Sequence, residues 1–284
     1  MILRILEMLI MISEYRRWIE NEKVPQDLKK ELYEIEGNTQ EIDARFGAPM
    51  SFGTAGLRGV MGAGIARMNL LTVRQATQAI ATLIIREGLE KEGCAVCHDC
   101  RNHSREFAQA AACVLAANGI TVRLFESMRP TPELSFAVRY HNCAAGINIT
   151  ASHNPKEYNG YKVYWSDGAQ LPPAHADTVA AEMSRIDVLN GAKTMSIEQA
   201  VKSGLIIPLG QETDEAYYKA VLEQSVLREG AAKELEMLRV IYTPFHGAGA
   251  KPVPEVLRRL GLKNLYCVEA QMEPRQLMLA PNNI

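Results

Sequence analysis

One stretch of the sequence gathers side chains that could together handle a phosphoryl group. It reads ITASHNPKEYNGYKVYW and covers residues 149–165, with Ser152, His153 and Asn154 side by side and Lys162 beyond a glycine-centred turn. A small hydroxyl can carry a phosphoryl group, while imidazole and amide groups beside it can orient its neighbours by hydrogen bonding. Phosphoryl transfer depends mainly on positioning and charge neutralisation, so cations around the hydroxyl count for more than a strong base. The stretch therefore predicts a loop that holds a reactive hydroxyl.

Two other interpretations compete for the same residues. Asn, Pro, Gly and Ser are turn formers for local steric reasons, so the cluster could be an ordinary connection between a strand and a turn. A lone serine in a turn is structural far more often than catalytic. A serine hydrolase is disfavoured, because residues 150–154 (TASHN) lack the glycines that flank the serine of a nucleophile elbow.

A glycine-rich stretch, SFGTAGLRGVMGAG at residues 51–64, is the second candidate. It has five glycines in fourteen residues, and Arg58 is its only charge. Such a stretch predicts a flexible loop whose backbone N–H groups approach an anion, and the planar guanidinium suits phosphate oxygens. The alternative is a plain glycine-rich linker. A third pair, Asp99 and Arg101, follows an apolar run, and we expect it to brace its own loop rather than to act in catalysis.

The elements that must position these residues alternate between helix and strand, which predicts an α/β fold: a mixed sheet with helices packed on it. We expect helices at 70–90 (with Thr72 as the cap), from about 105 to 119, at 132–141 and at 174–186, and strands at 94–98, 120–125, 144–150 and 161–165. Residues 238–269 repeat the order strand, glycine-bearing loop, helix, strand. We therefore expect a first domain at 1–205 and an incomplete second domain of similar architecture at 206–284.

The composition limits the possible partners and the cellular location. The 284 residues are 47% hydrophobic, which is ample for a buried core, and the net charge of −2 with dispersed Lys and Arg disfavours nucleic acid as a partner. The N-terminal apolar run is broken by Arg4 and Glu7 and is too short to span a bilayer, so we expect neither targeting nor membrane insertion. Translation could start at Met1 or at Met11. The oligomeric state is left open.

The first cysteines are spaced as C-x-x-C-x-x-C, a pattern that can hold a metal or a redox pair. Cys94 and Cys97 lie three apart in an expected strand, however, so their side chains should point to opposite faces. We expect free, buried thiols in a reducing cytoplasm.

Together these motifs resemble one family. TASHNPKEYNGYKVY resembles the phosphoserine loop of the α-D-phosphohexomutases, FGTAGLRG their N-terminal signature, and YTPFHGAG the opening of their second domain. The variants GTAGLRG and ASHNPKEYNGYKVYW are most similar to the phosphoglucomutase/phosphomannomutase branch. The resemblance covers about residues 13–271, and it implies that 1–205 is domain I and 206–284 a partial domain II.

The resemblance also implies roles for single residues. Ser152 would be the phosphorylated nucleophile and phosphate donor, with His153 and Asn154 shaping its loop. Lys162 would act as acid/base or electrostatic support near the transferring group, and Arg58 would contact the phosphate. The implied reaction interconverts hexose 1- and 6-phosphates through glucose 1,6-bisphosphate. Mg²⁺ would bind a phosphate oxygen on Ser152 together with protein carboxylates.

The sequence departs from the family after its second-domain motif. The family's Asp-Gly-Asp-x-Asp-Arg metal loop, its sugar-selecting loop and its later phosphate-binding loop are absent, so we expect an incomplete chain from a truncated or frame-shifted gene. Three alternatives stay open: a phosphopentomutase, a sugar-bisphosphate synthase of the same family, and an inactive fragment that binds sugar phosphates. The preferred sugar cannot be predicted without the selecting loop.

Overall fold

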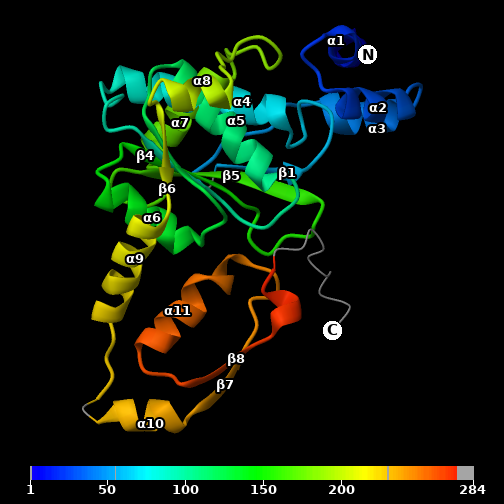
Figure 1. Ribbon diagram of the computed structural model, residues 1–284. Helices are drawn as coiled ribbons and strands as arrows, with labels where there is room; N and C mark the ends of the chain where they lie inside the picture. The colour runs from blue at the N-terminus through cyan, green and yellow to red at the C-terminus, as the bar shows by residue number, and fades with distance from the viewer. Residues whose placement is uncertain (1, 55, 229, 274–284) are drawn as a thin grey trace.

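A mixed sheet of six strands is the centre of the larger unit of this computed structural model, which describes residues 2–54, 56–228 and 230–273 (Figure 1). The strands are β1 (Leu57–Val60), β2 (Cys94–His98), β3 (Val122–Phe125), β4 (Ala145–Ile149), β5 (Tyr158–Trp165) and β6 (Ile206–Leu209). Their order in the sheet is β1-β5-β4-β2-β3-β6. The strands β4, β2, β3 and β6 run parallel, whereas β5 is antiparallel to both β4 and β1. The expected α/β fold with a mixed sheet is confirmed.

Helices cover both faces of this sheet (Figure 1). One face carries α4 (Leu70–Arg86), α5 (Ser104–Ala117), α7 (Pro173–Met183) and α8 (Ile197–Lys202), and the other carries α6 (Thr131–Tyr140), against which α9 (Gln211–Glu223) packs. The pleat of β2 explains both layers, because successive side chains of a strand point to opposite faces. Val96 packs into the core under α4 and α5, while Ala95 packs against α6.

The cysteines of β2 follow the same alternation. Cys94 lies in the core cluster under α4 and α5, and Cys97 lies in the cluster against α6. Both thiols are free and fully buried, and burial raises their pKa values well above the ordinary range. The expectation that their side chains point to opposite faces of the sheet is confirmed.

The first three helices have an apolar cluster of their own. They are α1 (Ile2–Glu20), α2 (Gln26–Glu34) and α3 (Thr39–Phe46). Trp18 is fully buried and meets the ring of Phe46 edge-on, with ring centroids 5.6 Å apart. In the part of the chain that the structure describes, no helix is both long and apolar enough to cross a membrane.

The strand–helix–strand repeat predicted near the C-terminus is present. The parallel strands β7 (Arg239–Tyr242) and β8 (Asn264–Cys267) are joined through α11 (Pro252–Arg259), while α10 (Ala231–Met237) precedes them. Two short 3₁₀ turns, η1 (Ala248–Ala250) and η2 (Glu269–Gln271), complete this unit. The division at 205/206 would separate β6 from the sheet in which it pairs with β3. We therefore propose a domain division after α9.

The start of α4 depends on one buried amide. Oδ1 of Asn69 accepts from the N–H groups of Leu71 and Thr72 at 3.0 and 3.1 Å, and its Nδ2 donates to the carbonyls of Gly62 and Gly64 at 2.9 and 3.0 Å. Thr72, expected as the cap, instead sits at the third helical position, where its hydroxyl accepts from the Asn69 N–H. Asn69 is the cap, and its amide group also donates hydrogen bonds to the loop that precedes the helix.

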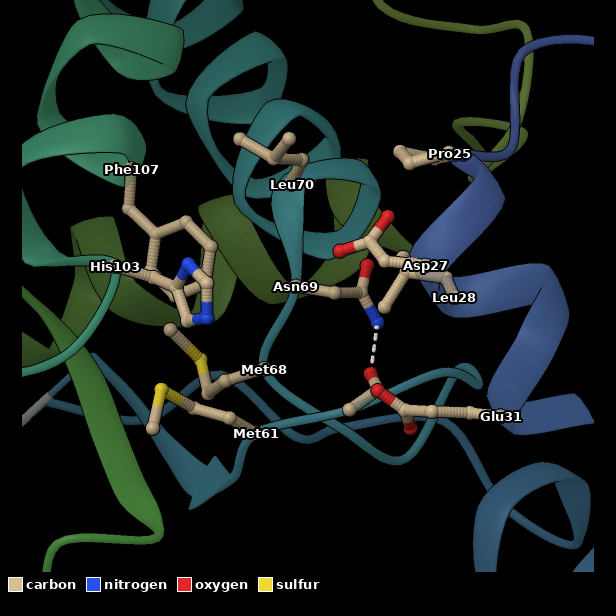
Figure 2. A pocket seen from close by; sticks show the side chains of 11 residues that line it. Pro25, Asp27, Leu28, Glu31, Met61, Met68, Asn69, Leu70, His103 and Phe107 are labelled. Atoms are coloured by element: carbon tan, nitrogen blue, oxygen red, sulfur yellow. Dashed lines mark hydrogen bonds between the residues drawn. The ribbon is translucent and has the colours of Figure 1, made fainter.

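Figure 2 shows this amide in the wall of a cavity of about 140 Å³ between α2 and the starts of α4 and α5. Met61, Met68 and Phe107 give the cavity an apolar lining, and the carboxylates of Asp27 and Glu31 lie along the side formed by α2. Met61 and Gly62 of the glycine-rich stretch line the cavity, but Arg58, Ser152 and Lys162 do not.

The substitution Asn69→Ala should lower the free energy of unfolding by about 2–4 kcal/mol, because it removes a helix cap and leaves buried carbonyls without donors. Urea unfolding followed by circular dichroism measures this. Asn38→Ala is the matched control: Asn38 caps α3 through a single exposed bond, from the Glu41 N–H, and its loss should cost about 1 kcal/mol. Equal effects of the two substitutions would contradict this account.

A buried ionic cluster joins the first unit to α9 and to the second unit. Arg129 Nε and Nη2 donate to the two carboxylate oxygens of Asp214 at 2.7 and 2.9 Å, and Lys251 also donates to Asp214. Glu133 is fully buried, and its nearest carboxylate oxygen is 3.5 Å from Arg129 Nε. Burial and the neighbouring Asp214 carboxylate raise the pKa of Glu133 to about 8. Burial alone would also raise the pKa of Asp214, but hydrogen bonds from Arg129 and Lys251 outweigh it and lower that pKa.

This cluster predicts a pH dependence of stability. An unfolded glutamate ionises near pH 4.3, whereas Glu133 keeps its proton up to about pH 8, so the folded chain binds more protons between these values. The contribution of Glu133 to the free energy of unfolding should therefore fall as pH rises through this window, by at most about 1.4 kcal/mol per pH unit. Glu133→Gln, which mimics the protonated form, should remove that slope.

Urea unfolding midpoints at half-unit steps between pH 5 and 8.5 measure the effect. Glu22→Gln, at an exposed glutamate of the α1–α2 connection, is the control and should leave the slope as it is. A Glu133→Gln chain with the unaltered slope would show that Glu133 is ionised in the folded protein.

Candidate active site

The candidate loops meet at the point in the sheet where the direction of the strand order reverses. The chain passes from β2 through α5 to β3 on one side, then returns through α6 to β4 on the other side of β2. Because β2 and β4 are parallel, their carboxyl ends lie at the same edge, and the loop at 99–103 follows one while the Ser152 loop follows the other. In open α/β sheets, ligands bind in the crevice at such a switch point. The topology therefore marks this edge as the candidate site independently of any motif.

Ser152 is exposed at the tip of this edge, in a backbone conformation that serine rarely adopts. Its φ of +57° is left-handed, a region that costs a non-glycine residue energy and that is enriched at active sites and ligand-binding turns. The Ser152 N–H donates to Thr150 Oγ1 at 3.0 Å, and its own Oγ lies 3.3 Å from Nδ1 of His153. The hydroxyl is thus accessible, while the peptide on its N-terminal side is held.

Arg101 holds the other side of the loop. Its side chain is 1% exposed, and its terminal nitrogens donate to four loop carbonyls, those of Ser152, Asn154, Pro155 and Tyr158. The sequence predicts a brace here, but in its own loop. The structure shows that Arg101 contacts Asp99 in its own loop and also reaches across from the end of β2 to the loop that follows β4.

A second link joins the same two loops. The buried Asn159 donates from Nδ2 to the carbonyl of Asn102 and to Oγ of Ser104, both at 3.0 Å. Sequence reasoning missed Asn159 and the target of Arg101. The available signal was the position of Arg101 just after the carboxyl end of β2 and of Asn159 at the amino end of β5, together with a rule for which strands are neighbours and how they run.

The glycine-rich stretch is neither a flexible loop nor a linker. Residues 57–60 form β1, which pairs antiparallel with β5 so that Arg58 lies opposite Gly160. Gly56 has φ +79°, and a Cβ there would lie 1.9 Å from the Tyr161 carbonyl, so the close approach of the two backbones requires glycine. The expectation of a flexible loop was wrong for residues 57–60, because ladder hydrogen bonds occupy their backbone, while anion binding by this stretch stays a prediction.

The structure brings Arg58 to the Ser152 loop. Nη1 of Arg58 donates to Oδ1 of Asn154 at 3.1 Å, two residues along the chain from Ser152. The guanidinium and the candidate hydroxyl therefore lie at the same edge of the sheet. Contact between Arg58 and a phosphate on Ser152 remains a prediction.

Lys162 lies in β5, opposite Asn148 of β4, and its side chain is half-buried. Burial lowers the pKa of its ammonium, and the nearby positive charge of Arg58 lowers it further, while Asp99 partly opposes both effects. Lys162 thus feels the positive charge of Arg58, whose guanidinium contacts the Ser152 loop. A nearby anion such as phosphate would stabilise both cations.

The residues at this edge do not form a magnesium site by themselves. Mg²⁺ prefers carboxylate oxygens in octahedral geometry. Asp99 is close to the loop, but its Oδ1 already accepts from Ser104 Oγ and from the Arg101 N–H at 2.8 and 2.9 Å. Among the described residues, no group of three or more His, Cys, Asp or Glu side chains could hold a metal ion. The part of the chain that the structure describes does not fit the ion that the resemblance implies.

Fold and site together define a class: an α/β protein with an exposed serine at the switch point, in a loop that Arg101 and Arg58 contact. Comparison with known proteins gives the family. Residues 49–189 match the model of the phosphoglucomutase/phosphomannomutase alpha/beta/alpha domain I, and the chain belongs to this family.

Two staphylococcal relatives, both called phosphoglucomutase, are similar over 90% of this chain. The protein of Staphylococcus saprophyticus is 35% identical over 257 residues, and that of Staphylococcus aureus is 36% identical over 260 residues. In each case the chain spans about 45% of the relative's length.

Solved structures agree in fold. The putative phosphomannomutase of Thermus thermophilus is 30% identical with a TM-score of 0.64, over 81% of this chain and 47% of that one. The phosphoglucomutase parafusin of Paramecium, at 19% identity and a TM-score of 0.59, covers 81% of this chain and 44% of its own and supports the fold alone.

The proximity of Arg58 to Lys162 can be tested by titration. The pKa of Lys162 should lie below the ordinary value of a lysine side chain, and Arg58→Ala should raise it, because a like charge is removed. Carbon-13 NMR of the lysine ε-methylene groups measures both values. Arg185→Ala, at an exposed arginine after α7, is the control. An unchanged Lys162 titration in Arg58→Ala would contradict the described geometry.

Proposed function

We propose that this chain is the phosphoserine-bearing part of a phosphoglucomutase/phosphomannomutase, an isomerase that interconverts hexose 1-phosphate and hexose 6-phosphate by phosphoryl transfer. One observation carries the proposal: Ser152 is exposed at the switch point in a strained backbone conformation, with Arg58 fixed beside it through Asn154. The names of the similar proteins support the same activity.

The proposed chemistry runs through phosphorylated Ser152. A sugar hydroxyl attacks the phosphorus, the bond between phosphorus and Oγ breaks, and a new phosphorus–oxygen bond gives the sugar bisphosphate. The sugar hydroxyl gives up its proton and Oγ of Ser152 gains one. After the bisphosphate reorients, the reverse transfer returns the other phosphoryl group to Ser152.

The neighbouring side chains have separate roles in this scheme. Arg58 and Lys162 offset the phosphate charge, and Lys162 can also supply the proton that Oγ takes up. His153 Nδ1, 3.3 Å from Oγ, orients the hydroxyl. Asn154 holds Arg58 in place.

We propose Mg²⁺ and glucose 1,6-bisphosphate as cofactors of the complete catalytic unit, with a phosphosugar as substrate and the cytoplasm as location. The ion would meet the phosphate on Ser152 and take its carboxylates from outside the described residues. The free state of all six cysteines supports a reducing compartment.

A second candidate function is a sugar-phosphate-binding fragment without turnover. It is favoured by the lack of a carboxylate trio among the described residues and by the share of about 45% that the chain spans in its relatives. Joining the chain to the remaining length of a relative distinguishes the two candidates.

The chain by itself should show no mutase turnover. A phosphoserine carries a charge of roughly −1.5 to −2, and without a carboxylate-held cation this charge is only partly offset. The substrate would also lack a second wall, and with it much of the roughly 7–11 kcal/mol that positioning can supply. A coupled assay with glucose 1-phosphate, catalytic bisphosphate and Mg²⁺ measures turnover. Activity comparable to a full-length relative, lost in Ser152→Ala, would refute this expectation.

Fusion of the chain to the remaining length of the S. aureus relative tests the function itself. We expect turnover of glucose 1-phosphate that disappears in Ser152→Ala and persists in Ser184→Ala, a control at an exposed serine after α7. A folded fusion that binds sugar phosphate but turns nothing over would favour the binding fragment.

A further inference from the structure

The two terminal nitrogens of Arg101 donate only to one loop. Nη2 donates to the carbonyls of Ser152 and Asn154 at 2.7 and 2.6 Å, and Nη1 donates to those of Pro155 and Tyr158 at 2.9 and 3.0 Å. These bonds use all four terminal N–H groups, because each terminal nitrogen carries two hydrogens. Arg101 therefore has no terminal donor left for a phosphate oxygen, although it lies beside the candidate nucleophile.

Arg101 is itself held from the end of β2. Its Nε lies 3.5 Å from Oδ2 of Asp99, while Oδ1 of Asp99 accepts from the hydroxyl of Ser104 at 2.8 Å. Ser104 begins α5, so the support extends into the core of the sheet. The arginine thus transmits the position of β2 and α5 to a loop that belongs to β4.

This support acts on a residue with an unfavourable backbone conformation. Ser152 has φ +57°, and its two peptide units are fixed by different partners: its N–H by Thr150 Oγ1 and its carbonyl by Arg101. A strained residue keeps such a conformation only when its surroundings over-determine it. A lysine could not replace this contact, because its ammonium is a point with three donors rather than a planar fork.

We propose that Arg101 is a positioning residue: it holds the Ser152 backbone in the left-handed conformation that presents a phosphate on Ser152 to Arg58 and Lys162. The proposal rests on the proposed function, since it concerns the phosphorylated serine. It assigns to Arg101 no contact with substrate or with the phosphate.

The test uses the full chain with phosphoserine incorporated at position 152 and follows its phosphorus-31 NMR signal through a pH titration. An exposed phosphoserine has its second pKa near 6, and cations close by should lower it by about one unit. We expect this lowered value in the otherwise unaltered chain. In Arg101→Lys and Arg101→Met it should return to about 6, and Arg58→Ala should raise it as well.

The matched control is Arg123→Met. Arg123 also donates to a backbone carbonyl, that of Glu92, but lies in β3 outside the loop. Its substitution should leave the phosphate titration where it is. Urea unfolding of every variant shows whether the fold is intact, so that a shifted titration in a stable Arg101 variant reports the loop and not the fold.

The outcomes separate the two ideas. A lowered phosphate pKa that persists in both Arg101 variants overturns the positioning proposal and leaves the proposed function standing. A value near 6 in the unaltered chain that Arg58→Ala does not change overturns the proposed function, and the positioning role with it. If neither Arg101 variant folds, amide hydrogen exchange of the unaltered chain decides. Exchange of the Asn154 and Tyr158 amides as slow as that of the β4 amides supports the proposal. Exchange as fast as in an unstructured peptide overturns it.

Discussion

A turn at the end of a strand removes carbonyls from the ladder, and buried carbonyls without donors are costly. In the Ser152 loop, one buried guanidinium supplies the missing donors, and the geometry of the site depends on this contact. A planar fork can satisfy several carbonyls only if they converge on one point. This convergence fixes the path of the loop. The exposed hydroxyl at its tip is therefore positioned by the backbone and not by packing of the Ser152 side chain.

The contact is possible only because β2 and β4 are neighbours. Residues about fifty positions apart meet across it, which requires the chain to return past β2 after forming β3. The same return creates the switch point at which the sheet opens to a ligand. The antiparallel β5 and the edge strand β1 then bring Lys162 and Arg58 to that opening, so each charged group arrives from a different strand.

Much of this architecture could be predicted from the sequence because it follows local pattern. The buried run of β2 and the amphipathic helices α4 and α5 have clear periodicity, and the serine loop has an unmistakable composition. β1 was missed because four residues among glycines show no period, and its formation depends on β5. The target of Arg101 was missed because it consists of backbone carbonyls, which every residue has and which the sequence therefore does not distinguish. Only the strand order shows which loop lies within reach of Arg101.

The charges around the site agree with the proposed phosphorylation of Ser152. Arg58 and Lys162 repel each other, and with burial this repulsion lowers the pKa of Lys162. A dianionic phosphate between them would reverse that effect and favour the charged ammonium, and by reciprocity the ammonium would favour the dianion. The gain depends steeply on distance, so a mobile serine would lose most of it. Stabilising a phosphate on Ser152 would therefore need both a fixed position of the Ser152 loop and the cations supplied by β1 and β5.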